Sequence, residues 1–180
     1  MNKGKHKITF AGIVFLILSG FTGPEAAGQL NLRHVQGVRY TGVSAAYDPG
    51  GINLGVHYGL FLKHNTGVAF GAYYEPGRAG TSNYRLVYGL CKYFYTAMNY
   101  RRWLYFNLEA GILLGNEKVE NSILEMDKSK FQYGFAPGIL TEIYLHSSVK
   151  FDFHVQPRIM PDRQTGTFDV ITGIGISYNF

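Results

Sequence analysis

Three residues that can take part in acid–base chemistry lie close together in one short segment: Asp152, His154 and Arg158. A carboxylate, an imidazole and a guanidinium on one face of a strand could move a proton and hold an anion. The same side chains could instead pair with one another in a polar interior. Bulky apolar residues alternate with them along Val149–Ile159, which favours the second interpretation. We therefore expect no catalytic residues in this chain.

Two further combinations of residues have chemical potential. His57 and His154 could bind a metal ion, but no third ligand at a recognised zinc spacing accompanies them. His146 and Ser147 resemble the pair used by lipid-A deacylating barrels. Such enzymes need the pair near the outer rim of the barrel, with a positioned base and an oxyanion site, whereas these residues fall in a turn expected at the opposite rim. The sequence predicts neither a metal site nor a cofactor-binding residue.

The elements that must position these residues are β-strands. The closing segment, Gly166–Phe180, has apolar or β-branched residues at every second position and mostly small or polar residues between them. This alternation is typical of a strand with two different faces. The pattern continues to the last residue, whereas chain ends are usually poorly ordered. Through Tyr178 and Phe180 the segment resembles the C-terminal signal strand of bacterial outer-membrane barrels.

The rest of the chain shows the same alternation between turn signals. Eight strands are predicted, over Gln36–Asp48, Ile52–Lys63, Val68–Tyr74, Tyr84–Thr96, Trp103–Gly115, Phe131–Leu145, Val149–Ile159 and Gly166–Phe180. Single-chain bacterial outer-membrane barrels have an even number of strands, starting at about eight. The expected fold is therefore all-β: an eight-stranded antiparallel up-and-down transmembrane β-barrel.

The predicted connections alternate in length, as the short periplasmic turns and longer external loops of such barrels do. The loops at Pro76–Asn83, Asn116–Lys130 and Pro161–Gly166 are expected outside. The most charged of them, Asn116–Lys130, is the expected contact surface, together with the periplasmic rim, where Arg101-Arg102 would anchor at the interface. Two residues interrupt the strand patterns: Lys92 implies a bulge or a side chain that reaches the interface, and Pro137 implies a bulge.

The barrel interior should hold the polar side chains of each strand. A narrow eight-stranded barrel is filled by side chains, and no continuous row of small residues is available to form a channel, so the sequence predicts a plugged barrel. The predicted inward-facing charged and imidazole residues are His57, Arg85, Glu109, Glu142, Lys150, Asp152, His154 and Arg158.

The N-terminus reads as an export signal. Lysines at positions 3, 5 and 7 precede an apolar run, and Ala26-Ala27-Gly28 offers a cleavage site. The expected division is a cleaved signal peptide at 1–28 and a barrel domain at 29–180, with the mature protein in the bacterial outer membrane. Removing three lysines and one glutamate leaves 14 basic and 11 acidic residues, a net charge of +3. A charge this small and scattered predicts no direct nucleic-acid binding.

Several segments of the mature chain resemble the conjugative transposon TraO family. The resemblance lies in Gln36–Arg39, Leu108–Gly115, the charged loop to Lys130, Tyr133-Gly134 with Glu142, and Gly173–Ile176. It implies a component or accessory of the envelope apparatus that transfers DNA between cells. The implied partners are outer-membrane lipid and other envelope proteins of a conjugative transfer system, with no small-molecule substrate and no catalytic residues.

Two other functions are compatible with the sequence. The chain could be a general small outer-membrane protein for adhesion or envelope integrity. It could also be a lipid-modifying barrel enzyme, in which case replacing Asp152 or His154 should abolish activity without affecting folding.

Overall fold

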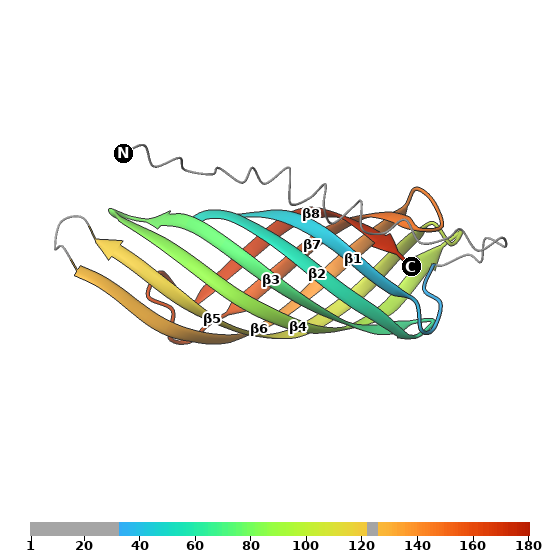
Figure 1. Cartoon of the computed structure of the whole chain (residues 1–180), viewed down its shortest axis with the longest axis horizontal. Coiled ribbons are helices and arrows are strands. Elements are labelled where there is room, and N and C mark those ends of the chain that lie inside the picture. The colour runs from blue at the N-terminus through green and yellow to red at the C-terminus, as the bar shows by residue number, and fades with distance from the viewer. Residues whose placement is uncertain (1–32, 122–125) are drawn as a thin grey trace, which may run out of the picture.

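A computed structural model describes residues 33–121 and 126–180, and it contains the predicted eight-stranded antiparallel barrel (Figure 1). Every strand pairs with its neighbour in sequence, and β1 pairs with β8 to close the barrel. The strands are β1 (Arg39–Asp48), β2 (Gly51–Lys63), β3 (Thr66–Ala79), β4 (Ser82–Tyr100), β5 (Leu104–Asn121), β6 (Met126–Tyr144), β7 (Val149–Ile159) and β8 (Phe168–Asn179). The predicted signal peptide lies outside the described residues.

The outer surface of the barrel is apolar. Side chains that a water-soluble protein would bury stand outward on every strand: Ile112 and Ile174 are each 63% exposed, and Phe153 is 46% exposed. Polar side chains alternate with them and point inward, as in barrels that face lipid outside and a polar lumen inside. The alternation predicted for β2, β3, β5, β6, β7 and β8 is confirmed in the direction expected. Among the described residues, no helix has the length and apolar character needed to cross a membrane.

The facing of β4 is the reverse of the prediction. Tyr84, Leu86 and Tyr88 point into the barrel and are almost fully buried. Arg85, predicted to face the lumen, is 59% exposed on the outside. The prediction placed the bulkier face of each strand toward lipid, but here the larger side chains fill the lumen.

Lys92 belongs to the same inward face of β4. It needs neither the bulge nor the interfacial position predicted for it, because its ammonium lies 3.0 Å from a Glu109 carboxylate oxygen. The register irregularities occur elsewhere, at Phe61/Lys63 and at Thr96/Met98.

The bulge predicted at Pro137 is also wrong. The register of β6 on β7 is the same on both sides of it and places Pro137 opposite Pro157, so pairing is interrupted where both residues lack a backbone donor.

Two predicted loops are largely strand. β3 and β4 continue through Pro76–Asn83 and leave only Gly80 and Thr81 between them. β5 and β6 continue through most of Asn116–Lys130, to Asn121 and from Met126. The predicted alternation of loop lengths therefore fails, and only the connection between β7 and β8 is long, at Met160–Thr167. The reason is that charged and polar residues can continue a ladder once it leaves the lipid.

The two ends of the barrel differ in shape. We call the end where β1 begins and β8 finishes the terminal end, and the opposite end the far end. At the far end β1, β2, β7 and β8 stop at a common rim, whereas β3 to β6 continue beyond it (Figure 1). We call these continuing parts the projecting sheet: Arg78–Ala79, Ser82–Leu86, Gly115–Asn121 and Met126–Gly134.

Candidate functional site

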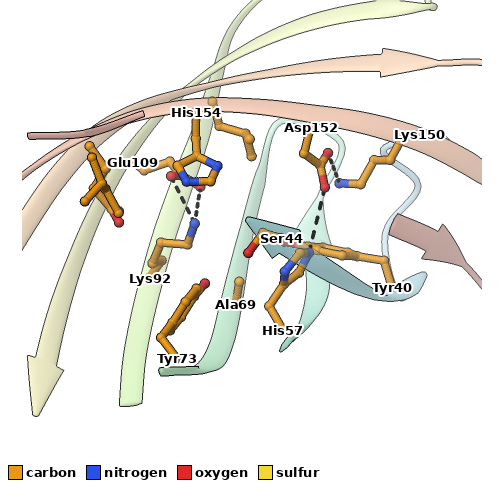
Figure 2. Close-up of a pocket in the computed structure, with 13 residues that line it drawn as sticks. Tyr40, Ser44, His57, Ala69, Tyr73, Lys92, Glu109, Lys150, Asp152 and His154 are labelled. Atoms are coloured by element: carbon orange, nitrogen blue, oxygen red, sulfur yellow. Dashed lines mark hydrogen bonds and ion pairs between the residues drawn. The ribbon is translucent and has the colours of Figure 1, made fainter. Parts of the chain in front are cut away.

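The lumen holds a chain of charged and polar side chains. Of the eight residues predicted to face inward, all but Arg85 do so. They form a cluster in the middle of the barrel and a network at each end. The middle cluster surrounds a cavity of about 30 Å³, enough for one or two water molecules (Figure 2).

A serine, a histidine and an aspartate meet in the middle cluster. The Ser177 hydroxyl donates a hydrogen bond to Asp152, and the His57 Nε2 atom lies 3.0 Å from the Ser177 oxygen. A serine hydrolase needs the imidazole between the hydroxyl and the carboxylate. Here the hydroxyl stands between the other two, and His57 is 3.8 Å from Asp152. The order of contacts and the burial of Asp152 and Ser177 fit a structural hydrogen-bond chain.

The rest of the middle cluster pairs cations with anions. Lys92 binds Glu109, and His154 projects toward this pair from β7 (Figure 2). His57 and His154 were the candidate metal ligands. Within the part of the chain that the structure describes, neither histidine belongs to a group of three potential metal ligands. Asp152 contacts Ser177 and Lys150, whereas Arg158 contacts carboxylates at the far end of the barrel. Asp152, His154 and Arg158 therefore do not form a single reactive site.

The terminal end is sealed by the segment before β1. His34 lies inside the barrel, 3% exposed, with its ring stacked on Tyr105 at a centroid distance of 3.9 Å. Its Nε2 atom contacts the Glu142 carboxylate, which also binds the fully buried Lys150 ammonium. The positive φ of His34, 48°, turns the chain inward here. Sequence reasoning missed this residue because it precedes the first strand.

A second ionic network seals the far end. Arg158 is completely buried and reaches three carboxylates: Asp48 at 3.0 Å, Glu75 at 2.6 Å and Asp169 at 2.7 Å. Asn53 and Tyr88 add hydrogen bonds to this group. Because each carboxylate comes from a different strand, one guanidinium ties β1, β3 and β8 to β7.

The long connection between β7 and β8 supplies a second arginine to this network. Arg163 folds back into the barrel mouth and contacts Glu75, Glu117 and Asp169. Burial alone would lower the pKa of its guanidinium, but the carboxylates of Glu75 and Asp169 outweigh that effect and hold the pKa above its ordinary value. The loop is thus an ionic plug, and its one arginine gave no periodic signal by which the sequence could identify it.

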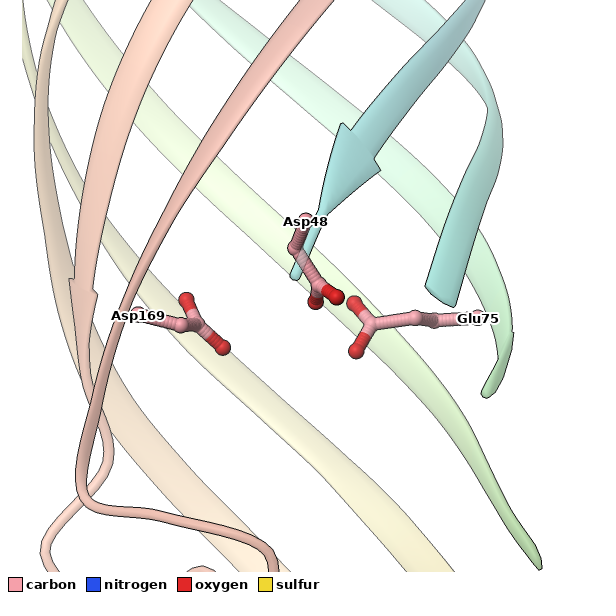
Figure 3. Close-up of side chains that lie close together, drawn as sticks. All are labelled: Asp48, Glu75 and Asp169. Carbon is pink, nitrogen blue, oxygen red and sulfur yellow. The ribbon is translucent and has the colours of Figure 1, made fainter. Parts of the chain in front are cut away.

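Asp48, Glu75 and Asp169 lie close enough together to suggest a cation site. Their oxygens are within 4.8 Å of one another, and they face each other across the barrel mouth (Figure 3). Arg158 touches all three, however, and Arg163 touches two. The guanidinium groups therefore occupy the position that a cation would take.

The remaining predicted positions lie at the terminal end. His146 and Ser147 are neighbours in the connection between β6 and β7, with 3.2 Å between Nδ1 and the hydroxyl. Arg101 and Arg102 form the turn between β4 and β5 and are exposed, and Arg101 stacks over the ring of Tyr100. Both arginines have positive φ, which non-glycine residues seldom adopt.

Apolar packing fills the space between the networks. One cluster includes Tyr73, Leu86, Leu113 and Met160, all buried toward the far end. A second lies toward the terminal end and includes Phe61 and Phe94, which are fully buried. The interior is therefore filled by side chains, as the sequence predicted.

Comparison with solved structures places this fold among small outer-membrane barrels. The N-terminal barrel domain of Pseudomonas aeruginosa OprF superimposes with a TM-score of 0.65 at 14% identity, over 81% of this chain and 98% of that one. Neisserial surface protein A gives 0.65 at 11% identity, over 79% and 96%. The attachment invasion locus protein Ail of Yersinia pestis gives 0.52 at 12% identity, over 81% and 100%.

Comparison of the sequence with family models and with curated proteins gives no match. The resemblance to TraO thus has no support from the family models and remains an expectation. Identities of 11–14% establish a shared fold alone. This chain has the fold of small eight-stranded outer-membrane β-barrels.

Proposed function

We propose that this protein is a non-enzymatic outer-membrane barrel that anchors and displays its projecting sheet outside the cell, as a component or accessory of a conjugative DNA-transfer apparatus. The terminal end then faces the periplasm and the far end faces outward, as in barrels of this class. The observation that carries the display role is the contrast between a sealed lumen and a sheet that leaves the barrel on one side. The link to conjugation rests on the resemblance of the sequence to TraO.

The ionic plugs support a role without transport. Arg163 and Arg158 fill the far end, His34 fills the terminal end, and apolar clusters occupy the space between. Purified protein in a planar lipid bilayer should show no steady ion conductance. Stepwise conductance by the wild-type protein would overturn the display role and indicate a pore.

The location and the fold in the membrane can be tested together. Outer membranes from cells that express the full chain should contain a band whose gel mobility changes on boiling, because a folded barrel resists unfolding by cold detergent. A soluble periplasmic protein without this shift would overturn the membrane assignment. Identical outer-membrane lipid profiles with and without the protein would support the absence of enzymatic activity, and a changed profile would overturn it.

The conjugative role needs a test of its own. Deleting the coding sequence from a donor strain should lower the frequency of DNA transfer, and the intact chain should restore it. A chain that lacks the tip of the β3–β4 hairpin, Gly80 and Thr81, provides a variant altered only in the projecting sheet. Unchanged transfer frequency after complete deletion would overturn the conjugative role.

A second candidate is attachment to other cells or to their surroundings. It is favoured by the projecting sheet and by the shared fold with Ail, whose name refers to attachment and invasion. In that case deletion should reduce adhesion of the bacteria to host cells or matrix, with no effect on DNA transfer. The two assays on one deletion strain therefore separate the two candidates.

A further inference from the structure

The projecting sheet has one open edge, on β6. β7 ends at Ile159, which pairs with Phe135, whereas β6 continues for nine more residues to Met126. We call Met126–Gly134 the open edge. On one side its backbone pairs continuously with β5, from Leu113 opposite Gly134 to Asn121 opposite Met126. On the other side the described residues provide no strand partner.

The connection that follows β7 enters the barrel mouth instead of pairing with this edge. After Ile159 the chain enters the barrel mouth, where Met160 is fully buried and Arg163 binds the far-end carboxylates. At Gly134 the edge packs against Ile159 and Met160, where the connection begins. Farther along, Gln132 donates to the Asp162 carbonyl oxygen at 3.3 Å, and Lys130 lies 3.7 Å from the Asp162 carboxylate. Among the described residues, no backbone hydrogen bond joins this loop to the open edge.

An exposed row of unpaired backbone donors and acceptors is a template for another strand. We propose that the open edge binds an extended, acidic segment of a partner protein, which adds to the projecting sheet beside β6. The added segment would take the place that β7 would occupy if it were as long as β6. Backbone hydrogen bonds would supply the affinity, and side chains at alternate positions would supply the selection.

Charge indicates the acidic partner. The open edge contains Lys128 and Lys130 against one aspartate, Asp127. Lys130 is 48% exposed, and Asp162, the carboxylate that it contacts, is 50% exposed, so the ammonium is accessible to a further carboxylate. Phe131 and Tyr133, on the outward face, are 60% and 47% exposed and can pack against apolar residues of the added strand.

A second copy in the same membrane fits the edge poorly. Strands of such barrels tilt by about 35–45° from the barrel axis. A two-fold axis along the membrane normal would therefore make two β6 strands cross at about 70–90°, whereas paired strands are rotated by only about 20–25°. Lysines opposite lysines would add repulsion.

The proposal rests on the display role, and a synthetic peptide can test it. The probe is Thr-Val-Glu-Ile-Glu-Val-Glu-Thr, labelled at its N-terminus and added to the full chain in lipid nanodiscs. Two matched probes carry N-methyl groups on one or the other set of alternate residues. In a strand added to an edge, only one set of amides faces the protein, so one methylated probe should bind like the parent and the other at least about tenfold more weakly.

Variants of the protein locate the binding. Lys130→Glu should weaken binding by about three- to tenfold. Lys118→Glu is the matched control: it changes an exposed lysine of β5 that pairs with Ser129 on the side of β6 opposite to the added segment, and should change binding by less than about twofold. Hydrogen exchange should show slowed amides within Ser129–Gly134 when the parent probe is bound.

Three results would overturn the proposal: equal binding of both methylated probes, no binding of the parent probe at 1 mM, or dimers in nanodiscs that exclude the probe, which would assign the edge to a second copy. The conductance and DNA-transfer measurements do not depend on probe binding. A failure of the open-edge proposal can therefore be told apart from a failure of the proposed function.

Discussion

The far-end network offers the sharpest test of how this barrel is held together, through Arg163→Ala. Arg163 is 4% exposed and contacts Glu75 and Glu117, both fully buried, and Asp169. Removing one partner of a buried ion pair costs about 3–5 kcal/mol, because the remaining charge stays out of water. Glu75 and Asp169 would each keep a contact with Arg158, so most of the loss falls on Glu117.

The contacts of Glu117 set the expected size of the effect. Arg163 is the only cation that contacts it among the described residues, and its other partners are the side chains of Gln132 and Thr165 and the backbone N–H of Gln164. Hydrogen bonds from these neutral donors would still stabilise the Glu117 carboxylate. We therefore expect the free energy of unfolding to fall by an amount near the lower limit, about 3 kcal/mol. Adding Glu117→Gln to Arg163→Ala should recover a measurable part of it, because the stranded charge is then absent.

Urea unfolding in lipid vesicles can measure these differences, with the fluorescence of Trp103, the single tryptophan, as the signal. The control is Lys130→Ala, which removes an exposed pair to Asp162 at 3.7 Å and should cost less than about 1 kcal/mol. If Arg163→Ala unfolds at the same urea concentration as this control, the loop is not an ionic plug. If the double variant is less stable than Arg163→Ala, the stranded charge on Glu117 is not the cause.

Three further predictions test facing, pairing and assembly. Phe153→Arg should lower the free energy of unfolding by about 2–4 kcal/mol in vesicles, because the side chain faces lipid near the middle of β7; a harmless Phe153→Arg beside a damaging His154→Arg would reverse the assigned facing. Lys92→Met should cost several kcal/mol by leaving the Glu109 carboxylate buried without its cation, and Lys92→Met with Glu109→Gln should be closer to wild type; equal losses in the single and double variants would contradict this pairing. Deleting Phe180 should reduce the amount of protein in outer membranes more than it reduces the unfolding free energy of refolded protein, and unchanged membrane levels would argue against a signal role for this residue.

The architecture was accessible from the sequence because one physical constraint dominates it. A strand that separates lipid from a polar lumen must alternate apolar and polar residues, and β7 does so at nearly every position between Val149 and Ile159. Facing is harder to predict than periodicity. Tyr84, Leu86 and Tyr88 are as bulky as lipid-facing residues elsewhere, yet they fill the lumen. Lys92 lies on the same face of β4. In the sequence, its charge was the indication that this face points into the lumen and not toward lipid.

The ends of the barrel could not be predicted in the same way. Strand lengths beyond the membrane are not limited by hydrophobicity, so Glu117 and Lys130 looked like loop residues although both lie in strands. The two plugs depend on single residues in irregular segments, His34 and Arg163. Their positions follow from which buried carboxylates need a cation, and that requirement becomes visible only once the strands bring Glu75, Glu117 and Glu142 into the lumen.

The far-end plug also explains why the projecting sheet can be open. A loop between β7 and β8 has two possible positions: over the edge of β6 or inside the barrel mouth. The buried carboxylates Glu75 and Glu117 bind Arg163 and draw the loop inward, which leaves Met126–Gly134 uncovered. Arg163→Ala should therefore do more than lower stability. By releasing the loop it should allow Met160–Thr167 to compete for the edge, so the acidic probe should bind this variant more weakly than it binds Lys118→Glu. Equal binding would mean that the plug and the open edge are independent features of the fold.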